Sequence, residues 1–186
     1  MAEYQDKRVD NIIRKKGYEA IKIFYSPLKV WLTYLMMFLF LIGVPLLIGG
    51  AIFDLLNIIL KLKYFILTYI VIAYLFQARF NNNIAFTGNE CLIINPNIPF
   101  RYFKEIKVQQ IEMVTIDKDA GIRILGWIFG WGSGNYIIIK TKDQVMKYYC
   151  LCLEEDYVDE NLTQLTMDDL HSIFREKEIP VRYNLD

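Results

Sequence analysis

Tyr136-Ile-Ile-Ile-Lys-Thr-Lys142 and Val145-Met-Lys-Tyr-Tyr-Cys-Leu-Cys-Leu153 form the stretch of the chain that most directly indicates its fold. Both segments are rich in β-branched and aromatic residues, and only Asp143-Gln144 separates them. Two apolar strands joined by a two-residue polar connection are typical of a β-hairpin. The sequence therefore predicts an antiparallel pair here, with its turn at residues 143 and 144.

Similar patterns precede this hairpin along the chain. Residues 84–94 predict a hairpin around Gly88-Asn89, residues 108–117 (VQQIEMVTID) predict a further strand, and residues 121–131 (GIRILGWIFGW) another. Turn signals at intervals of 8–14 residues are typical of a small sandwich or barrel.

The pattern changes after residue 165. Thr166 and Asp169 have the spacing of a capping box, and apolar residues then recur at helical intervals. We expect a helix over about 167–178, ended by Pro180. It would cap an open barrel of about six or seven strands, a domain that we place at 81–186.

Two apolar runs precede the predicted domain. Residues 30–53 (VWLTYLMMFLFLIGVPLLIGGAIF) contain no charge over 24 residues, and a second run extends over about 61–80. A helix of about 20 apolar residues spans the hydrocarbon core of a bilayer. The sequence therefore predicts a transmembrane helical hairpin at 30–80, and the fold class of an α+β membrane protein in which this hairpin precedes the β-barrel or sandwich.

Basic residues set the expected orientation. Residues 1–29 form a basic segment that includes Arg14, Lys15 and Lys16, whereas the loop between the two runs and the start of the second run carry only Lys61 and Lys63 as basic residues. The positive-inside rule then places both termini in the cytoplasm. We expect a multi-pass protein of a bacterial inner membrane whose N-terminal lysines and arginine contact lipid phosphates.

This order of elements resembles the bacterial membrane proteins that carry a pleckstrin-homology-like (PH-like) domain. The resemblance extends to a small family marked by a Tyr-Ser-x-x-Lys segment, here Tyr25-Ser26-Pro27-Leu28-Lys29, and later by Gln110-Ile111, Leu125-Gly126 and Tyr136–Ile139. It covers nearly the whole chain and implies a fold and a membrane setting, without an agreed activity. Phosphoinositide-binding PH domains use basic residues in the first hairpin, and residues 84–94 contain none.

Three aromatic residues, Trp127, Phe129 and Trp131, alternate along one predicted strand, so we expect their rings on one face. They would either pack in the core or form a contact surface for a partner or the membrane interface. Lys140 and Lys142 share a strand face in the same way, and would be solvated or would contact lipid phosphates.

Glu154, Glu155 and Asp156 begin an acidic run before the C-terminal helix. This run lacks the twelve-residue calcium loop with its central glycine, so we expect no metal site. A solvated surface and a docking site for a basic protein partner are the two interpretations of the run.

The chemistry of the chain favours binding over catalysis. Its 186 residues carry 21 basic and 21 acidic side chains, a balance that disfavours a nucleic-acid-binding protein. It holds a single histidine and lacks the motifs of nucleophilic, zinc or phosphate-loop enzymes, so we expect no catalytic residues and no cofactor.

The sequence predicts a membrane-anchored, non-enzymatic module that holds a protein partner at the inner face of the membrane. A special case is an immunity protein that neutralises a toxin there. The alternative is a PH-like domain that senses a lipid or a small ligand. A membrane-embedded enzyme is a less favoured third hypothesis.

Overall fold

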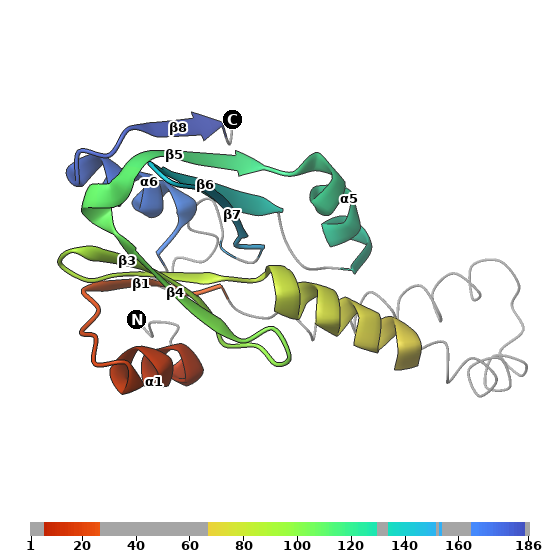
Figure 1. The fold of residues 1–186 in the computed structure, drawn as a ribbon. Coiled ribbons are helices and arrows are strands. Elements are labelled where there is room, and N and C mark those ends of the chain that lie inside the picture. The colour runs from red at the N-terminus through yellow and green to blue at the C-terminus, as the bar shows by residue number, and fades with distance from the viewer. Residues whose placement is uncertain (1–5, 27–66, 130–133, 152, 154–164, 185–186) are drawn as a thin grey trace, which may run out of the picture.

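The computed structural model describes residues 6–26, 67–129, 134–151, 153 and 165–184. These residues form an α+β fold with two four-stranded sheets (Figure 1). The first sheet has the strand order β1-β2-β3-β4, and the second has the order β7-β6-β5-β8.

The first sheet is antiparallel throughout. It comprises β1 (Lys22–Phe24), β2 (Asn83–Phe86), β3 (Glu90–Asn95) and β4 (Tyr102–Lys107). The predicted hairpin around Gly88-Asn89 is confirmed, because Phe86 pairs with Cys91 across that turn. The other two strands of this sheet, β1 and β4, were not predicted from the sequence.

The second sheet contains the hairpin that opened the sequence analysis. A short 3-10 helix, η2 (Val108–Gln110), leads into β5 (Ile111–Lys118), which pairs with β6 (Asn135–Thr141). The hairpin of β6 and β7 (Val145–Tyr149) is confirmed, with Tyr136 opposite Tyr149. The final strand, β8 (Val181–Asn184), runs parallel to β5.

The helices α1 and α6 pack against the sheets. The predicted C-terminal helix is confirmed as α6 (Met167–Glu176), and Thr166 and Asp169 form the capping box. It contributes Leu170 and Phe174 to the main core, which contains residues of both sheets. The N-terminal α1 (Lys7–Lys15) covers the outer face of the first sheet, where Val9, Ile12 and Ile13 pack against β2 and β3 (Figure 1).

The prediction of a strand over 121–131 is wrong for its described part, because residues Ala120–Phe129 form the helix α5. Asp119 accounts for this local choice, since its carboxylate accepts hydrogen bonds from the backbone N–H groups of Gly121 and Ile122 at 3.1 and 3.2 Å. An acidic residue in this position satisfies N–H groups that have no partner within the helix. Short apolar runs fit a strand or a helix equally well from periodicity alone.

Within the described ranges, no helix combines the length and the apolar content that crossing a bilayer requires. This finding contradicts the predicted transmembrane hairpin, the predicted fold class of a membrane protein and the predicted multi-pass localisation. Residues 30–53, and residues 61–66 of the second predicted span, lie outside the described residues. The part that is described, residues 67–80, is helical.

The end of the 67–80 helix belongs to the domain. Ala73, Gln77 and Ala78 are buried, and the side-chain amide of Asn95 donates a hydrogen bond of 2.8 Å to the carbonyl of Ala78. The Phe80 ring packs edge-on against Tyr149, with ring centroids 5.2 Å apart. These contacts join the C-terminal end of the helix to the strands, whereas the larger apolar residues Leu67, Val71 and Ile72 are exposed.

Candidate functional site

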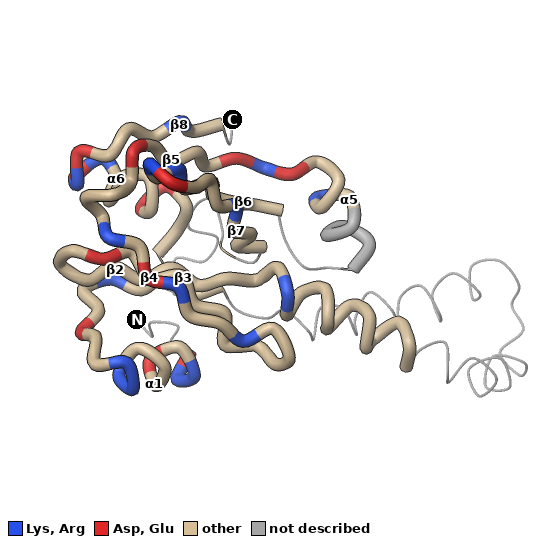
Figure 2. Tube along the Cα trace, in the orientation of Figure 1, with Lys and Arg blue, Asp and Glu red and all other residues tan. Residues whose placement is uncertain are grey.

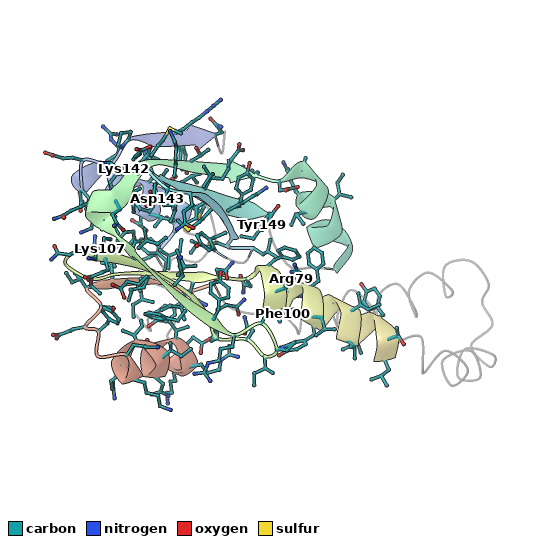
Figure 3. All side chains as sticks on the ribbon, in the orientation of Figure 1. Arg79, Phe100, Lys107, Lys142, Asp143 and Tyr149 are labelled. Carbon is teal, nitrogen blue, oxygen red and sulfur yellow. The ribbon has the colours of Figure 1, made fainter. Side chains whose placement is uncertain are left out.

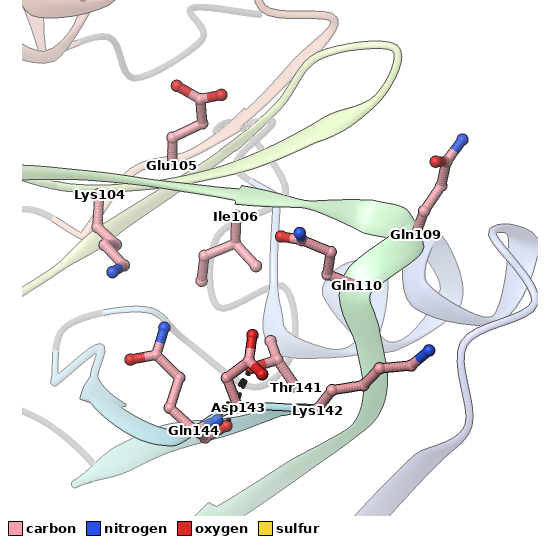
Figure 4. Close-up of a pocket in the computed structure, with 9 residues that line it drawn as sticks. All are labelled: Lys104, Glu105, Ile106, Gln109, Gln110, Thr141, Lys142, Asp143 and Gln144. Atoms are coloured by element: carbon pink, nitrogen blue, oxygen red, sulfur yellow. Dashed lines mark hydrogen bonds between the residues drawn. The ribbon is translucent and has the colours of Figure 1, made fainter.

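A groove lies between the edge of the first sheet and the turn of the β6–β7 hairpin. Its cavity volume is about 400 Å³, within the range of ligand sites in proteins. The lining residues come from β4, from η2 and from the turn: Lys104, Glu105, Ile106, Gln109, Gln110, Thr141, Lys142, Asp143 and Gln144 (Figure 4). We call this feature the β4 groove.

The β4 edge forms one wall of the groove. In the strand order of the first sheet β4 is the last member, so its outer edge pairs with no strand among the described residues. Lys104 and Ile106 point from β4 toward the hairpin turn, while Glu105 points to the other side of the sheet (Figure 4). There Glu105 accepts a hydrogen bond from the Tyr18 hydroxyl, which raises the pKa of that hydroxyl.

The hairpin turn forms the opposite wall, and its backbone is held by Thr141. The Thr141 N–H donates a hydrogen bond of 2.9 Å to the carbonyl of Gln144, and the Gln144 N–H donates to Thr141 Oγ1 at 3.3 Å. The side chains of Asp143 and Gln144 point from this turn toward β4 (Figure 4). Gln110 closes the side of the groove formed by η2.

The chemistry of the groove suits a polar, extended ligand. Gln110 and Gln144 each carry a donor and an acceptor in one amide, as a peptide group does. Lys104 and Asp143 place one positive and one negative charge at the same opening, with Ile106 as a buried apolar contact. Such a set can hold an extended main chain beside an open strand edge.

The two lysines of the predicted pair, Lys140 and Lys142, have different surroundings in the structure. Lys140 forms an ion pair with Glu112 on the neighbouring strand, at 3.3 Å, so its charge is compensated within the sheet. Lys142 lies at the exposed end of the hairpin, beside Asp143 and on the same side of the molecule as Lys107 (Figure 3). Only Lys142 of the predicted pair therefore lines the groove.

The predicted N-terminal basic residues gather at the end of α1. Arg14 and Lys15 occupy its last turn and Lys16 is its C-cap, so these charges complement the helix dipole. Figure 2 shows basic residues at both ends of α1, with an acidic residue between them. The Lys16 ammonium also lies 5.6 Å from the centroid of the Phe103 ring. These residues face away from the groove, across the first sheet.

The predicted aromatic surface does not exist as a strand face, because Trp127 and Phe129 belong to the helix α5. Their side chains, and all of Trp131, lie outside the described part of the chain. The acidic residues Glu154, Glu155 and Asp156 lie outside it as well.

The sequence analysis did not predict that Lys104, Gln110 and Gln144 belong to one site. The hairpin pattern placed Asp143 and Gln144 at a turn, which is the one available signal. Nothing in the sequence pattern brings that turn next to residues 104–110, because the approach depends on how the two sheets pack.

A search of protein-family models, curated proteins and solved structures finds no match to this chain. The resemblance to bacterial proteins with a PH-like domain therefore stays a prediction.

Proposed function

We propose that this protein is a non-enzymatic binding module, and that an extended segment of a protein partner binds in the β4 groove. The observation that carries the proposal is the open edge of β4 beside a polar groove. An added strand takes its affinity from main-chain hydrogen bonds to such an edge and its specificity from neighbouring side chains. Gln110 and Gln144 would bond its peptide groups, while Lys104 and Asp143 would select its charges.

Site-specific photo-cross-linking in cells tests this proposal. A photoreactive phenylalanine analogue replaces Gln144 in the full-length chain, and the same analogue replaces Glu176 on α6 as a control position. We expect a distinct cross-linked protein from position 144 only. Its identity would separate a toxin, and hence an immunity function, from other partners.

Variants of the groove make the test specific. Gln110→Ala and Lys104→Glu should each lower the yield of the cross-link several-fold. Lys107→Glu is the matched control for Lys104→Glu, because Lys107 is the same residue type on the same strand, is exposed and does not line the groove. Equal yields in all three variants, or the same protein from position 176, would overturn the proposal. A co-purifying small molecule that the groove variants lose would instead favour ligand sensing.

A further inference from the structure

A corner of two tyrosine rings and one carboxylate lies near the far end of the β6–β7 hairpin. Tyr136 and Tyr149 are directly opposite each other on the two strands, and their rings meet at 61° with centroids 5.7 Å apart. The Lys147 ammonium lies 3.7 Å from the centroid of the Tyr136 ring and 4.6 Å from that of Tyr149. It also lies 3.2 Å from Asp119 Oδ2.

The carboxylate of this corner is fixed independently of Lys147. Asp119 Oδ1 accepts the two backbone hydrogen bonds that begin α5. Asp119 Oδ2 accepts a hydrogen bond of 2.8 Å from the Tyr149 hydroxyl. The bond from Tyr149, together with the bonds from Ile122 and Lys147, lowers the pKa of Asp119, so the group is charged at neutral pH. The carboxylate and one ring of the corner therefore hold each other in place.

Lys147, in contrast, enters the corner from solvent. Its side chain is 38% exposed, and it reaches the rings on a flexible four-carbon stem. Partial burial of the ammonium lowers the pKa of Lys147. The hydrogen bonds of the ammonium to Tyr149 and Asp119 outweigh this effect, so the pKa of Lys147 is raised. The surroundings thus favour a cation at this point, whichever molecule supplies it.

We propose that the corner of Tyr136, Tyr149 and Asp119 is a binding site for alkylammonium groups, which Lys147 occupies in the free protein. Aromatic faces attract ammonium cations, and a carboxylate adds a charge-assisted hydrogen bond. The site is distinct from the β4 groove, which lies at the turn of the same hairpin, and it does not depend on the function proposed for the groove.

An intramolecular occupant changes the affinity for an external one. Because Lys147 is tethered two residues from Tyr149, it competes at high effective concentration, and an incoming cation binds more weakly to the wild-type chain. Two sources share the required chemistry: a lysine side chain of another protein, and a quaternary ammonium group. Only the primary ammonium can donate a hydrogen bond to Asp119.

The test uses the full chain with ¹³C-labelled tyrosine rings, followed by NMR during titration with n-butylammonium or tetramethylammonium. In Lys147→Ala, which empties the corner, we expect saturable shifts of the Tyr136 and Tyr149 rings. The midpoint should fall several-fold below that of the wild type. In Lys147→Ala, a preference for butylammonium over tetramethylammonium would favour a primary ammonium as the natural ligand, and the reverse preference would favour a quaternary one. Adding Asp119→Asn should abolish a preference for butylammonium, because only the primary ammonium donates a hydrogen bond to Asp119.

Two control variants keep the result interpretable. Lys147→Arg keeps a cation on a stem of similar length, so it should gain no affinity. Lys140→Ala removes the neighbouring exposed lysine of β6 and should behave as the wild type. The proposal is overturned if Lys147→Ala shows no saturable shift, or if its shifts persist unchanged after Tyr136→Leu. Unfolding of Lys147→Ala, detected by loss of dispersed tyrosine signals, would show that Lys147 is a structural element and would equally reject an exchangeable site.

Discussion

Asp119 stabilises two parts of the fold, and two different substitutions at this position should separate the two contributions to the free energy of unfolding. One carboxylate oxygen caps α5 through the N–H groups of Gly121 and Ile122. The other accepts the Tyr149 hydroxyl and the Lys147 ammonium. Asp119→Asn can keep the cap but removes the charge, whereas Asp119→Ala removes both.

The expected costs follow from these contacts. Asn caps helices as well as Asp does, so Asp119→Asn loses chiefly a partly exposed ion pair, about 0.2–1 kcal/mol, and the charge assistance to one hydrogen bond. We expect a loss of about 1–2 kcal/mol in the free energy of unfolding. Asp119→Ala adds the loss of a cap, about 1 kcal/mol, for a total of about 2–3 kcal/mol.

Urea denaturation at neutral pH, followed by circular dichroism, measures both differences. The pKa of Asp119 is lowered from its ordinary value of 3.8, principally by the Tyr149 hydrogen bond. A lowered folded-state pKa gives stability that is present above the unfolded-state value and is lost as pH falls through the folded-state value. The gap between wild type and Asp119→Asn should therefore stay constant above about pH 5 and shrink in acid below about pH 4.

Two results would refute this reasoning. Equal destabilisation by the Asn and Ala variants would show that Asp119 does not cap α5. A gap that widens in acid would show that the carboxylate is destabilised in the folded state.

Three further predictions concern packing and reactivity. Gly134→Ala should destabilise by about 2 kcal/mol or more, because Gly134 has φ of +77° and an added Cβ would lie 3.0 Å from two backbone atoms. Gly88→Ala is its control, with no heavy atom within 4 Å of the added Cβ; equal thermal melting of the two variants would contradict the argument. Phe174→Ala should cost about 3–5 kcal/mol in urea denaturation, because its ring is fully buried, and a cost below about 1 kcal/mol would place Phe174 outside the core. Burial raises the pKa of the Cys91 thiol to about 12, so iodoacetamide at pH 8 should label Cys91 far more slowly in the native protein than in urea; labelling at equal rates would show that the thiol is accessible.

Several elements could be predicted from the sequence because their signals are local. The β6–β7 hairpin follows from alternating strands around Asp143-Gln144, and α6 follows from the capping box at Thr166. Neither depends on distant parts of the chain, since a turn and a cap are satisfied within a few residues.

The predictions made from apolar runs alone were wrong in two places. Residues 120–129 alternate in a way that suits a strand, yet the cap at Asp119 makes them a helix. The 67–80 segment has the composition of part of a membrane span, yet Ala73 and Ala78 are buried in the domain. Apolar composition predicts that a segment will be buried, but it does not identify the surface against which the segment packs.

The sequence by itself determined the local units: the two hairpins, the cap of the last helix and the absence of familiar catalytic motifs. The tertiary structure alone decided that β1 joins β2, that β8 runs parallel to β5, and that the edge of β4 faces the turn at Asp143. Only packing likewise brings Asp119 to Lys147, 28 residues away. Such contacts are set by how whole sheets bury their faces together, and that arrangement leaves no periodic signal in the chain.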